Sequence, residues 1–261
     1  VGIAVGNVVG SNIANILLIL AVAALVCPIP CPRSAIRRDG AVAFLAAALA
    51  VAVAQYGSMP RLAGMVFVVL LIAYLIASYR ADTGSPSPPG EADLVAPVVH
   101  GPAWLSGGFV LGGLFGVIVG AALLVDGATV VARSAGVSET VIGLTLVAVG
   151  TSLPELTVSI IAAMRRELDV ALGNIIGSNI FNLFGVLGVT AIVHPLEFSP
   201  QVAAFDVWVM VGATIVMSVF ALTRMRIERW EGAVLLAGYA IYLWAQFDPR
   251  LHAALGLAPM S

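Results

Sequence analysis

A single carboxylate lies deep inside one of the most apolar stretches of this sequence. Glu155 stands in the segment GTSLPEL, where Pro154 precedes it and two hydroxyl-bearing residues, Thr151 and Ser152, come one turn earlier. Because proline has no N–H group and clashes with the carbonyl one turn before it, we expect the helix to kink and to free backbone carbonyls. Carboxylate, hydroxyl and carbonyl oxygens are the ligands that hard cations such as Na⁺ and Ca²⁺ prefer. The segment therefore predicts half of a cation-binding site.

The neighbouring residues supply further oxygen atoms at helical spacing. Positions i, i+3, i+4 and i+7 share one face of a helix. These positions are occupied by Ala148, Thr151, Ser152 and Glu155. On the next apolar segment, Ser178 and Asn182 are four residues apart and also share a face. Small residues at such spacings are common in helix contacts without any ion, and a lone buried glutamate can be a neutral structural acid. The binding-site hypothesis therefore rests on the coincidence of carboxylate, kink, hydroxyls and amide.

The elements that must hold these residues are membrane-spanning helices. The chain is 61% hydrophobic and 10% charged, with a mean hydropathy of +1.07, which excludes an ordinary soluble domain. The apolar runs lack the alternation of barrel strands, so they are expected to be helices. Eight spans are predicted, at about 1–26, 40–56, 61–79, 104–125, 139–164, 169–193, 203–222 and 230–247. The predicted fold class is an all-α polytopic membrane protein.

The sequence also contains an internal duplication. The segment GNVVGSNIANILLILAV at 6–22 aligns with GNIIGSNIFNLFGVLGV at 173–189 at a constant offset of 167, and nine of the seventeen positions are identical. One repeat comprises five spans, and because this number is odd, the second copy enters the membrane from the opposite side. Inverted repeats are typical of secondary transporters, whose substrates bind near the midplane on interrupted helices.

The duplication predicts what would complete the site. Ser11 and Asn15 stand in the first copy where Ser178 and Asn182 stand in the second. By the same offset, the partner of Glu155 would lie upstream of Val1. We therefore expect a missing N-terminal segment of two helices, ten in all, that carries the partner glutamate. The polypeptide as given is expected to hold an incomplete site and not to transport alone.

The chain is divided into four parts. These are a first half-repeat at 1–79 (helices three to five of ten), a linker rich in Ser, Pro, Gly and acids at 80–103, a second half-repeat at 104–247 (helices six to ten) and a C-terminal tail at 248–261. The chain has no lysine, and nine of its twelve arginines fall on alternate connections between spans. The positive-inside rule places these connections in the cytoplasm. We therefore expect a multi-pass protein of the cell membrane.

Three other acids have structural interpretations. Asp39 and Asp206 each begin a predicted span, where a carboxylate caps exposed N–H groups and suits the helix dipole. Asp126 lies late in the span that starts near Trp104 and could pair with Arg133 or cap a helix break. We assign all three to structure rather than to ion binding.

The motifs resemble those of a known family. GTSLPEL followed by ALGNIIGSNIFN resembles the second α-repeat of the calcium/cation antiporter superfamily, the sodium/calcium exchanger membrane region, most closely in its prokaryotic members. GNVVGSNIAN is similar to the latter half of the first α-repeat. The resemblance implies a ten-helix inverted-repeat antiporter fold with a cluster of cation sites, in which Na⁺ entry drives Ca²⁺ out.

The resemblance also implies a ligand set, with Glu155 as the bidentate Ca²⁺ ligand. The implied ligands are Ala148 and Thr151 through their carbonyls, the Thr151 hydroxyl, Ser152, Glu155, Ser178, Asn182, Ser11 and Asn15. Two departures matter. The first repeat's proline–glutamate motif is absent from this sequence, and several exchangers carry Asp where Asn182 stands, which bears on stoichiometry and selectivity.

The expected function is that of a Na⁺/Ca²⁺ antiporter, with H⁺/Ca²⁺ exchange as the alternative because carboxylates also carry protons. Two glutamates would hold a charge of about −2, which balances one Ca²⁺, two Na⁺ or two H⁺ in a low dielectric. A cation channel is less favoured because the polar residues form isolated clusters rather than a continuous stripe. An enzyme is least favoured because no nucleophile and base pair occurs at membrane depth. We expect no cofactor and no nucleic-acid partner, only the transported ions and the lipid bilayer.

Overall fold

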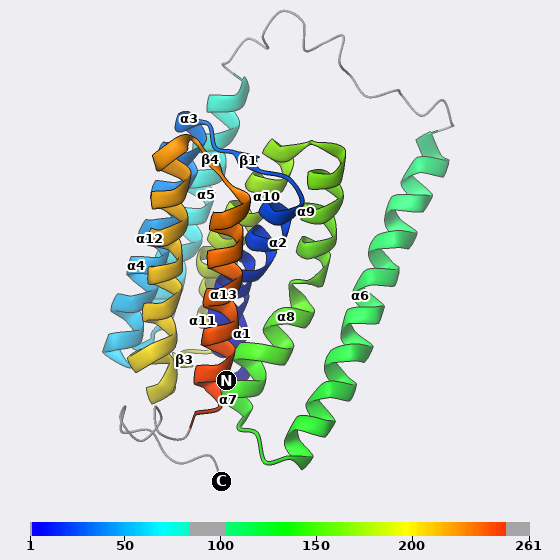
Figure 1. Cartoon of the computed structure of the whole chain (residues 1–261). Helices are drawn as coiled ribbons and strands as arrows, with labels where there is room; N and C mark the ends of the chain where they lie inside the picture. The colour runs from blue at the N-terminus through cyan, green and yellow to red at the C-terminus, as the bar shows by residue number, and fades with distance from the viewer. Residues whose placement is uncertain (1, 84–102, 249–261) are drawn as a thin grey trace, which may run out of the picture.

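The structure is a computed structural model that describes residues 2–83 and 103–248 (Figure 1). The predicted linker and C-terminal tail fall almost entirely on 84–102 and 249–261, outside these residues. The described chain is a bundle of long helices, as uninterrupted apolar runs require in a medium where each backbone group must be satisfied within its own segment.

The first copy of the repeat forms three long helical segments. The first segment consists of α1 (Gly2–Ala14), a π-helical stretch (Asn15–Leu20) and α2 (Ala21–Val26). The second consists of α3 (Arg33–Ala35), a π-helical turn (Ile36–Gly40) and α4 (Ala41–Tyr56), and the third is α5 (Arg61–Thr83). Gly57 ends α4 in the left-handed region, at φ 85°, a conformation that glycine adopts without steric cost.

The second copy repeats this pattern after two additional segments. The additional segments are α6 (Ala103–Ser134) and a broken helix made of α7 (Glu139–Ile142), a π-helical turn (Gly143–Val147), α8 (Ala148–Thr151) and α9 (Leu153–Arg165). The segments that match the first copy are α10 (Leu168–Ile180), a π-helical stretch (Phe181–Leu187) and α11 (Gly188–Val193), then a π-helical turn (Val202–Asp206) and α12 (Val207–Arg224), and last α13 (Arg229–Gln246).

The predicted count of eight spans is not confirmed. Within the described ranges, six helices are long and apolar enough to cross a membrane, and the broken helix makes seven if its two halves count as one span. All eight predicted segments are helical, but α13, 18 residues long, is not among those seven. Its first turn carries Arg229 and Glu231, and it ends on Gln246, so its polar ends lower its mean hydropathy.

Two short antiparallel pairs of strands join the copies at opposite ends of the bundle. At one end β1 (Ile29–Pro30) pairs with β4 (Arg226–Ile227), and at the other β2 (Ser58–Met59) pairs with β3 (Leu196–Glu197). In the alignment of the two copies, β1 is equivalent to β3 and β2 is equivalent to β4. Each pair therefore contains one strand from each copy, and an inverted two-fold relation exchanges the pairs. Figure 1 shows β1 and β4 at the top and β3 towards the bottom.

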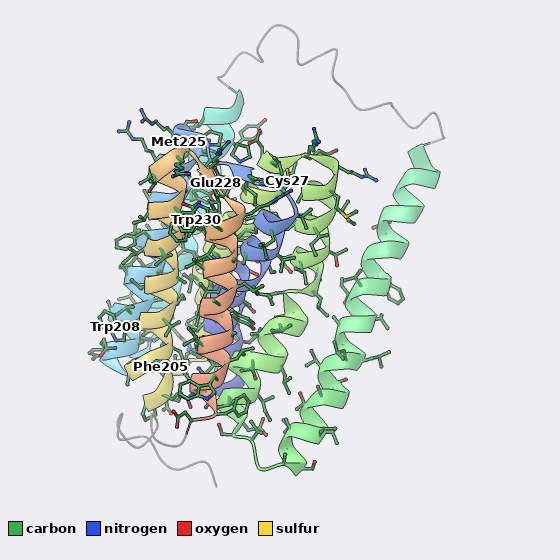
Figure 2. All side chains as sticks on the ribbon, viewed as in Figure 1. Cys27, Phe205, Trp208, Met225, Glu228 and Trp230 are labelled. Carbon is green, nitrogen blue, oxygen red and sulfur yellow. The ribbon has the colours of Figure 1, made fainter. Side chains whose placement is uncertain are left out.

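Residues from both copies lie at each of these two ends of the bundle. Figure 2 shows Cys27, Met225 and Glu228 at the end that carries β1 and β4, and Phe205 and Trp208 towards the opposite end. The segment after Val26 and the turn after Arg224 therefore meet at one end, as the arginine pattern of the sequence requires. The buried core lies between these ends, mainly on the helices that have an equivalent in each copy.

Two equivalent glycines allow helices of opposite copies to touch. Gly64 on α5 packs on the backbone of α11, where a Cβ would lie 2.6 Å from the Gly188 carbonyl oxygen. Gly232 on α13 packs on α2 in the same way, where a Cβ would lie 2.8 Å from the Ala21 carbonyl oxygen. Close backbone approach of this kind is a common use of small residues between membrane helices.

Replacement of Gly232 by valine is expected to separate α13 from α2. Overpacking of a tight contact costs about 1–3 kcal/mol, because the clash is with backbone that cannot rotate away. The matched control is Gly212→Val on α12, where an added Cβ meets nothing within 4 Å. Thermal unfolding in detergent should show a lower midpoint for Gly232→Val than for Gly212→Val. Equal midpoints would contradict the close contact.

The prediction that Asp39 and Asp206 cap helix starts is wrong. Each lies inside a helix, in the π-helical turns at Ile36–Gly40 and Val202–Asp206, and the helical span in the first copy already begins at Arg33. Their carboxylates instead accept hydrogen bonds from tyrosines on another helix, Tyr74 at 3.1 Å and Tyr242 at 3.0 Å. Both acids therefore connect two helices within one copy.

Candidate cation-binding site

The site is organised by a break in the helix that contains Glu155. The segment Glu139–Thr151 meets Leu153–Arg165 at an angle of 44°. Ser152 forms the joint with φ −93° and ψ 3°, and Pro154 stands in the first turn of α9. The predicted kink is therefore confirmed. Because proline supplies no N–H group, the backbone at the joint has one helical hydrogen bond fewer, which favours exposure of a carbonyl there.

On one side of the break, three of the predicted ligands line a common cavity. This cavity has a volume of about 280 Å³ and is lined by Glu155, Gly173, Asn174, Gly177, Ser178, Phe181 and Asn182. The Oε2 atom of Glu155 is buried and has no hydrogen-bond partner. At Gly173 and Gly177 an added Cβ would meet nothing within 4 Å, so these glycines leave the cavity open. An unpartnered carboxylate oxygen in such a cavity is suited to a cation.

On the other side of the break, three further predicted ligands are in contact. The Ser11 hydroxyl oxygen lies 3.3 Å from the Ala148 carbonyl oxygen and 3.2 Å from the Thr151 hydroxyl oxygen. The contact joins α1 of the first copy to α8 of the second. Ser152 is buried at the joint between the two groups. The structure thus gathers these residues around the broken helix from two copies of the repeat.

Asn15 has a different environment from its repeat equivalent Asn182. Its Nδ2 donates a hydrogen bond of 2.9 Å to Asn179 Oδ1, and the residue is fully buried. Its Oδ1 is buried without a partner. The amide nitrogen is therefore held by the opposite copy, while the carbonyl oxygen keeps both lone pairs.

Two asparagines next to the site were not among the predicted ligands. The Oδ1 of Asn7 accepts a hydrogen bond of 2.9 Å from the Thr151 hydroxyl. Asn174 Nδ2 donates to the Glu155 carbonyl oxygen at 3.3 Å and to the Ser159 hydroxyl at 3.1 Å. The two asparagines occupy equivalent positions in the repeat, each directly after the first glycine of its GNxxGSN motif. That equivalence was present in the alignment and is the signal that could have indicated them.

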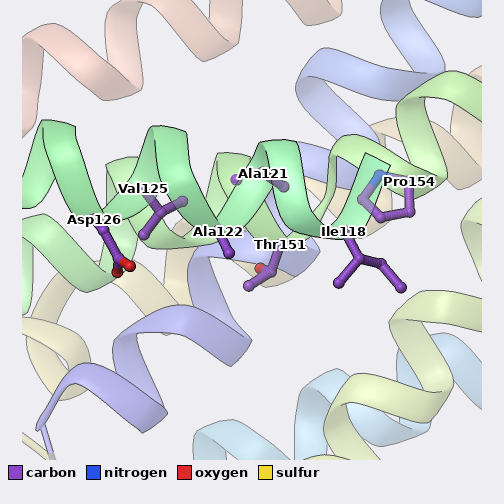
Figure 3. A pocket seen from close by; sticks show the side chains of 8 residues that line it. Ile118, Ala121, Ala122, Val125, Asp126, Thr151 and Pro154 are labelled. Carbon is purple, nitrogen blue, oxygen red and sulfur yellow. The ribbon is translucent and has the colours of Figure 1, made fainter. Parts of the chain in front are cut away.

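A second cavity lies between α6 and the broken helix (Figure 3). It has a volume of about 390 Å³ and is lined by Ile118, Ala121, Ala122, Val125, Asp126, Gly150, Thr151 and Pro154. Neither structural role suggested for Asp126 is found: Arg133 pairs with Glu139, at 2.6 Å between Nε and Oε1. Asp126 lies inside the unbroken helix α6 rather than at a helix break. Figure 3 shows Asp126 on α6 at one end of the cavity, Thr151 near its middle and Pro154 at the other end. Asp126 and Thr151 line this cavity, and neither lines the cavity of Glu155.

The described residues contain no cluster of three His, Cys, Asp or Glu side chains that could hold a metal ion. A cation at the break would therefore be bound mainly by neutral oxygens around one carboxylate. Residues 1–80 and 105–247 match the sequence profile of the sodium/calcium exchanger protein family. The chain belongs to this family.

Relatives of the exchanger family match almost the whole chain. The putative antiporter CaxA of Alkalimonas amylolytica is 37% identical over 253 residues, which cover 94% of this chain and 78% of that protein. The sodium/calcium exchanger MaX1 of Methanosarcina acetivorans is 33% identical over 281 residues, 94% of this chain and 80% of that protein. These matches confirm the resemblance to the calcium/cation antiporter superfamily and to its prokaryotic members.

A solved exchanger structure has the same fold. The sodium-calcium exchanger NCX_Mj, soaked with 2.5 mM Na⁺ and 0.1 mM Ca²⁺, has a TM-score of 0.72 and 35% sequence identity to this chain, and the match covers 94% of this chain and 76% of that one. Together with the apolar helices, this confirms an all-α, multi-pass membrane protein with an antiporter fold. The chain is a transporter of the calcium/cation antiporter class rather than an enzyme.

Proposed function

We propose that the full-length protein extrudes Ca²⁺ from the cytoplasm across the cell membrane in exchange for Na⁺, by alternating access to the cavity at Glu155. The observation that carries the proposal is the unpartnered, buried Oε2 of Glu155 beside Ser178 and Asn182, at the break of a membrane helix. An intramembrane carboxylate without a partner is costly and marks an ion pathway. The names of MaX1 and NCX_Mj, both sodium–calcium exchangers, support the same choice of ions.

The proposed ligands are the oxygen atoms that surround the break. They are the Glu155 carboxylate, the hydroxyls of Ser11, Thr151, Ser152 and Ser178, the amide oxygens of Asn15 and Asn182, and the backbone carbonyls of Ala148 and Thr151. Ca²⁺ requires about six to eight oxygen ligands, so residues from both copies are needed. Na⁺ and Ca²⁺ would compete for the same carboxylate, so one ion must leave before the other binds.

Uptake of ⁴⁵Ca²⁺ into proteoliposomes that contain the full-length protein tests this function. Vesicles loaded with Na⁺ should take up Ca²⁺, and vesicles loaded with K⁺ should not. Uptake is also measured with an imposed proton gradient and no Na⁺, because a carboxylate can carry H⁺ in place of Na⁺. Uptake driven only by the proton gradient would replace Na⁺ by H⁺ as the coupling ion. Uptake independent of either gradient would indicate a channel.

A further inference from the structure

The two copies of the repeat contain equivalent acids outside the cation site, Asp39 half-buried and Asp206 fully buried. Asp39 and Asp206 occupy matching positions in the repeat alignment, and so do Tyr74 and Tyr242, the tyrosines that donate to them. The Tyr74 hydroxyl lies 3.1 Å from Asp39 Oδ1, and the Tyr242 hydroxyl lies 3.0 Å from Asp206 Oδ1. Each pair ties a π-helical turn of one span to the next span in the same copy.

The copies differ in how the charge of the acid is balanced. In the first copy, Arg38 Nε lies 2.8 Å from Asp39 Oδ1, and the two residues form an ion pair. The residue equivalent to Arg38 in the second copy is Phe205. Its ring stacks on that of Tyr242, with ring centroids 6.3 Å apart and an interplanar angle of 17°. The arginine has therefore been replaced by a side chain that cannot neutralise a carboxylate.

The donors that remain around Asp206 are neutral. Gln246 Nε2 donates to Asp206 Oδ1 at 2.6 Å, and Gln246 is itself held by Gln201, whose Nε2 lies 2.5 Å from Gln246 Oε1. Asp206 and Gln246 are each 0% exposed. The second carboxyl oxygen of Asp206, Oδ2, is buried and has no hydrogen-bond partner.

No counter-charge reaches Asp206 from the elements packed against its helical turn in the described part of the chain. These elements include α1, α4 and α12, with α13 supplying Tyr242 and Gln246. Helix α1 has no titratable side chain, α4 has only the exposed Tyr56, and α12 has only Arg224 in its last turn. On α13 the titratable groups at this end are Tyr242 and Tyr239, whose rings lie 6.3 Å apart. A bare carboxylate here would be a buried charge without compensation.

We propose that Asp206 is a proton-binding site. A bound proton neutralises this carboxylate, as Arg38 neutralises Asp39 in the first copy. The proton resides on Oδ2, and the neutral acid keeps its two hydrogen bonds through Oδ1. Since the turn that contains Asp206 packs against α1, which carries Ser11, loss of the proton loosens the support of a helix that contributes to the cation site. The proton at Asp206 is thus separate from the ions that bind at Glu155.

Infrared spectroscopy of the full-length protein tests the protonation directly. A protonated carboxyl has a C=O stretch above the amide I band, and we expect this band in the wild type at neutral pH. It should be lost in Asp206→Asn. It should also be lost in Phe205→Arg, which keeps the carboxyl but restores the ion pair of the first copy. Asp39→Asn is the matched control and should leave the band unchanged. A band of undiminished intensity in both Asp206→Asn and Phe205→Arg would overturn the proposal.

The functional consequence rests on the proposed Ca²⁺ exchange and is measured separately. Exchange by the wild type should fall as the pH becomes alkaline, because Asp206 then loses its proton. In Asp206→Asn and in Phe205→Arg that alkaline loss should disappear. Equal alkaline loss in all three proteins would overturn the link between Asp206 and α1. A protein with no Ca²⁺ exchange at any pH would refute the proposed function, while the infrared band would still report on Asp206.

Discussion

Replacement of Glu155 by glutamine is expected to abolish Ca²⁺ exchange. Glu155 supplies the one carboxylate in the cavity that Ser178 and Asn182 also line, and glutamine keeps its shape while removing its charge. Loss of one partner from a buried charge pair costs about 3–5 kcal/mol, which is more than a hundredfold in affinity. ⁴⁵Ca²⁺ uptake into Na⁺-loaded vesicles should therefore fall to the level of protein-free vesicles.

The matched control for this variant is Asp126→Asn. Asp126 is an acid of the same charge near the same broken helix, but it lines the cavity beside α6 and not the cavity that Glu155 lines. We expect Asp126→Asn to retain most of the uptake. Equal losses of uptake in the two variants would mean that any negative charge near the break supports uptake. Full uptake by Glu155→Gln would show that Glu155 is not a ligand.

Two features of the architecture could be predicted from the sequence, the inverted repeat and the helix break. The duplication at an offset of 167 predicted inverted copies, and the pairing of Ile29 with Ile227 and of Met59 with Leu196 agrees with it. Pro154 predicted the break, which the structure shows at Ser152. These features depend on a repeat in the sequence and on the missing N–H group of a proline, and both can be recognised in the sequence alone.

Contacts between the copies could not be predicted in the same way. The amide of Asn15 is held by Asn179, which belongs to the other copy, and Asp206 is buried by donors from α13 rather than exposed at a helix start. A position in an alignment gives the face of a helix but not the helix that it meets. The prediction of Asp206 as a helix cap failed for this reason, because the partner that decides its role is distant in sequence.

The equivalent asparagines Asn7 and Asn174 are expected to have opposite hydrogen-bonding roles. Asn174 contacts the Glu155 carbonyl oxygen, which can only accept, so Asn174 must donate. Asn7 accepts the proton of the Thr151 hydroxyl, which leaves the lone pairs of that oxygen available to a cation. One asparagine therefore positions the backbone at Glu155, and the other orients the Thr151 hydroxyl.

Aspartate substitution distinguishes these roles because at both positions it preserves the acceptor, removes the donor and adds the same negative charge, so that the two variants are compared with each other. Asn174→Asp should raise the KM for Ca²⁺ about tenfold, as expected for loss of about 1.4 kcal/mol when a buried carbonyl loses its donor. Asn7→Asp should not raise the KM, whereas Asn7→Ala should, because the Thr151 proton then turns to the Ala148 carbonyl oxygen, which lies 3.2 Å away and is itself a proposed ligand. If the two aspartate variants behave alike, the hydrogen bonds do not have these directions. If Asn7→Ala leaves the KM unchanged, the hydrogen bond from Thr151 to Asn7 does not orient a ligand.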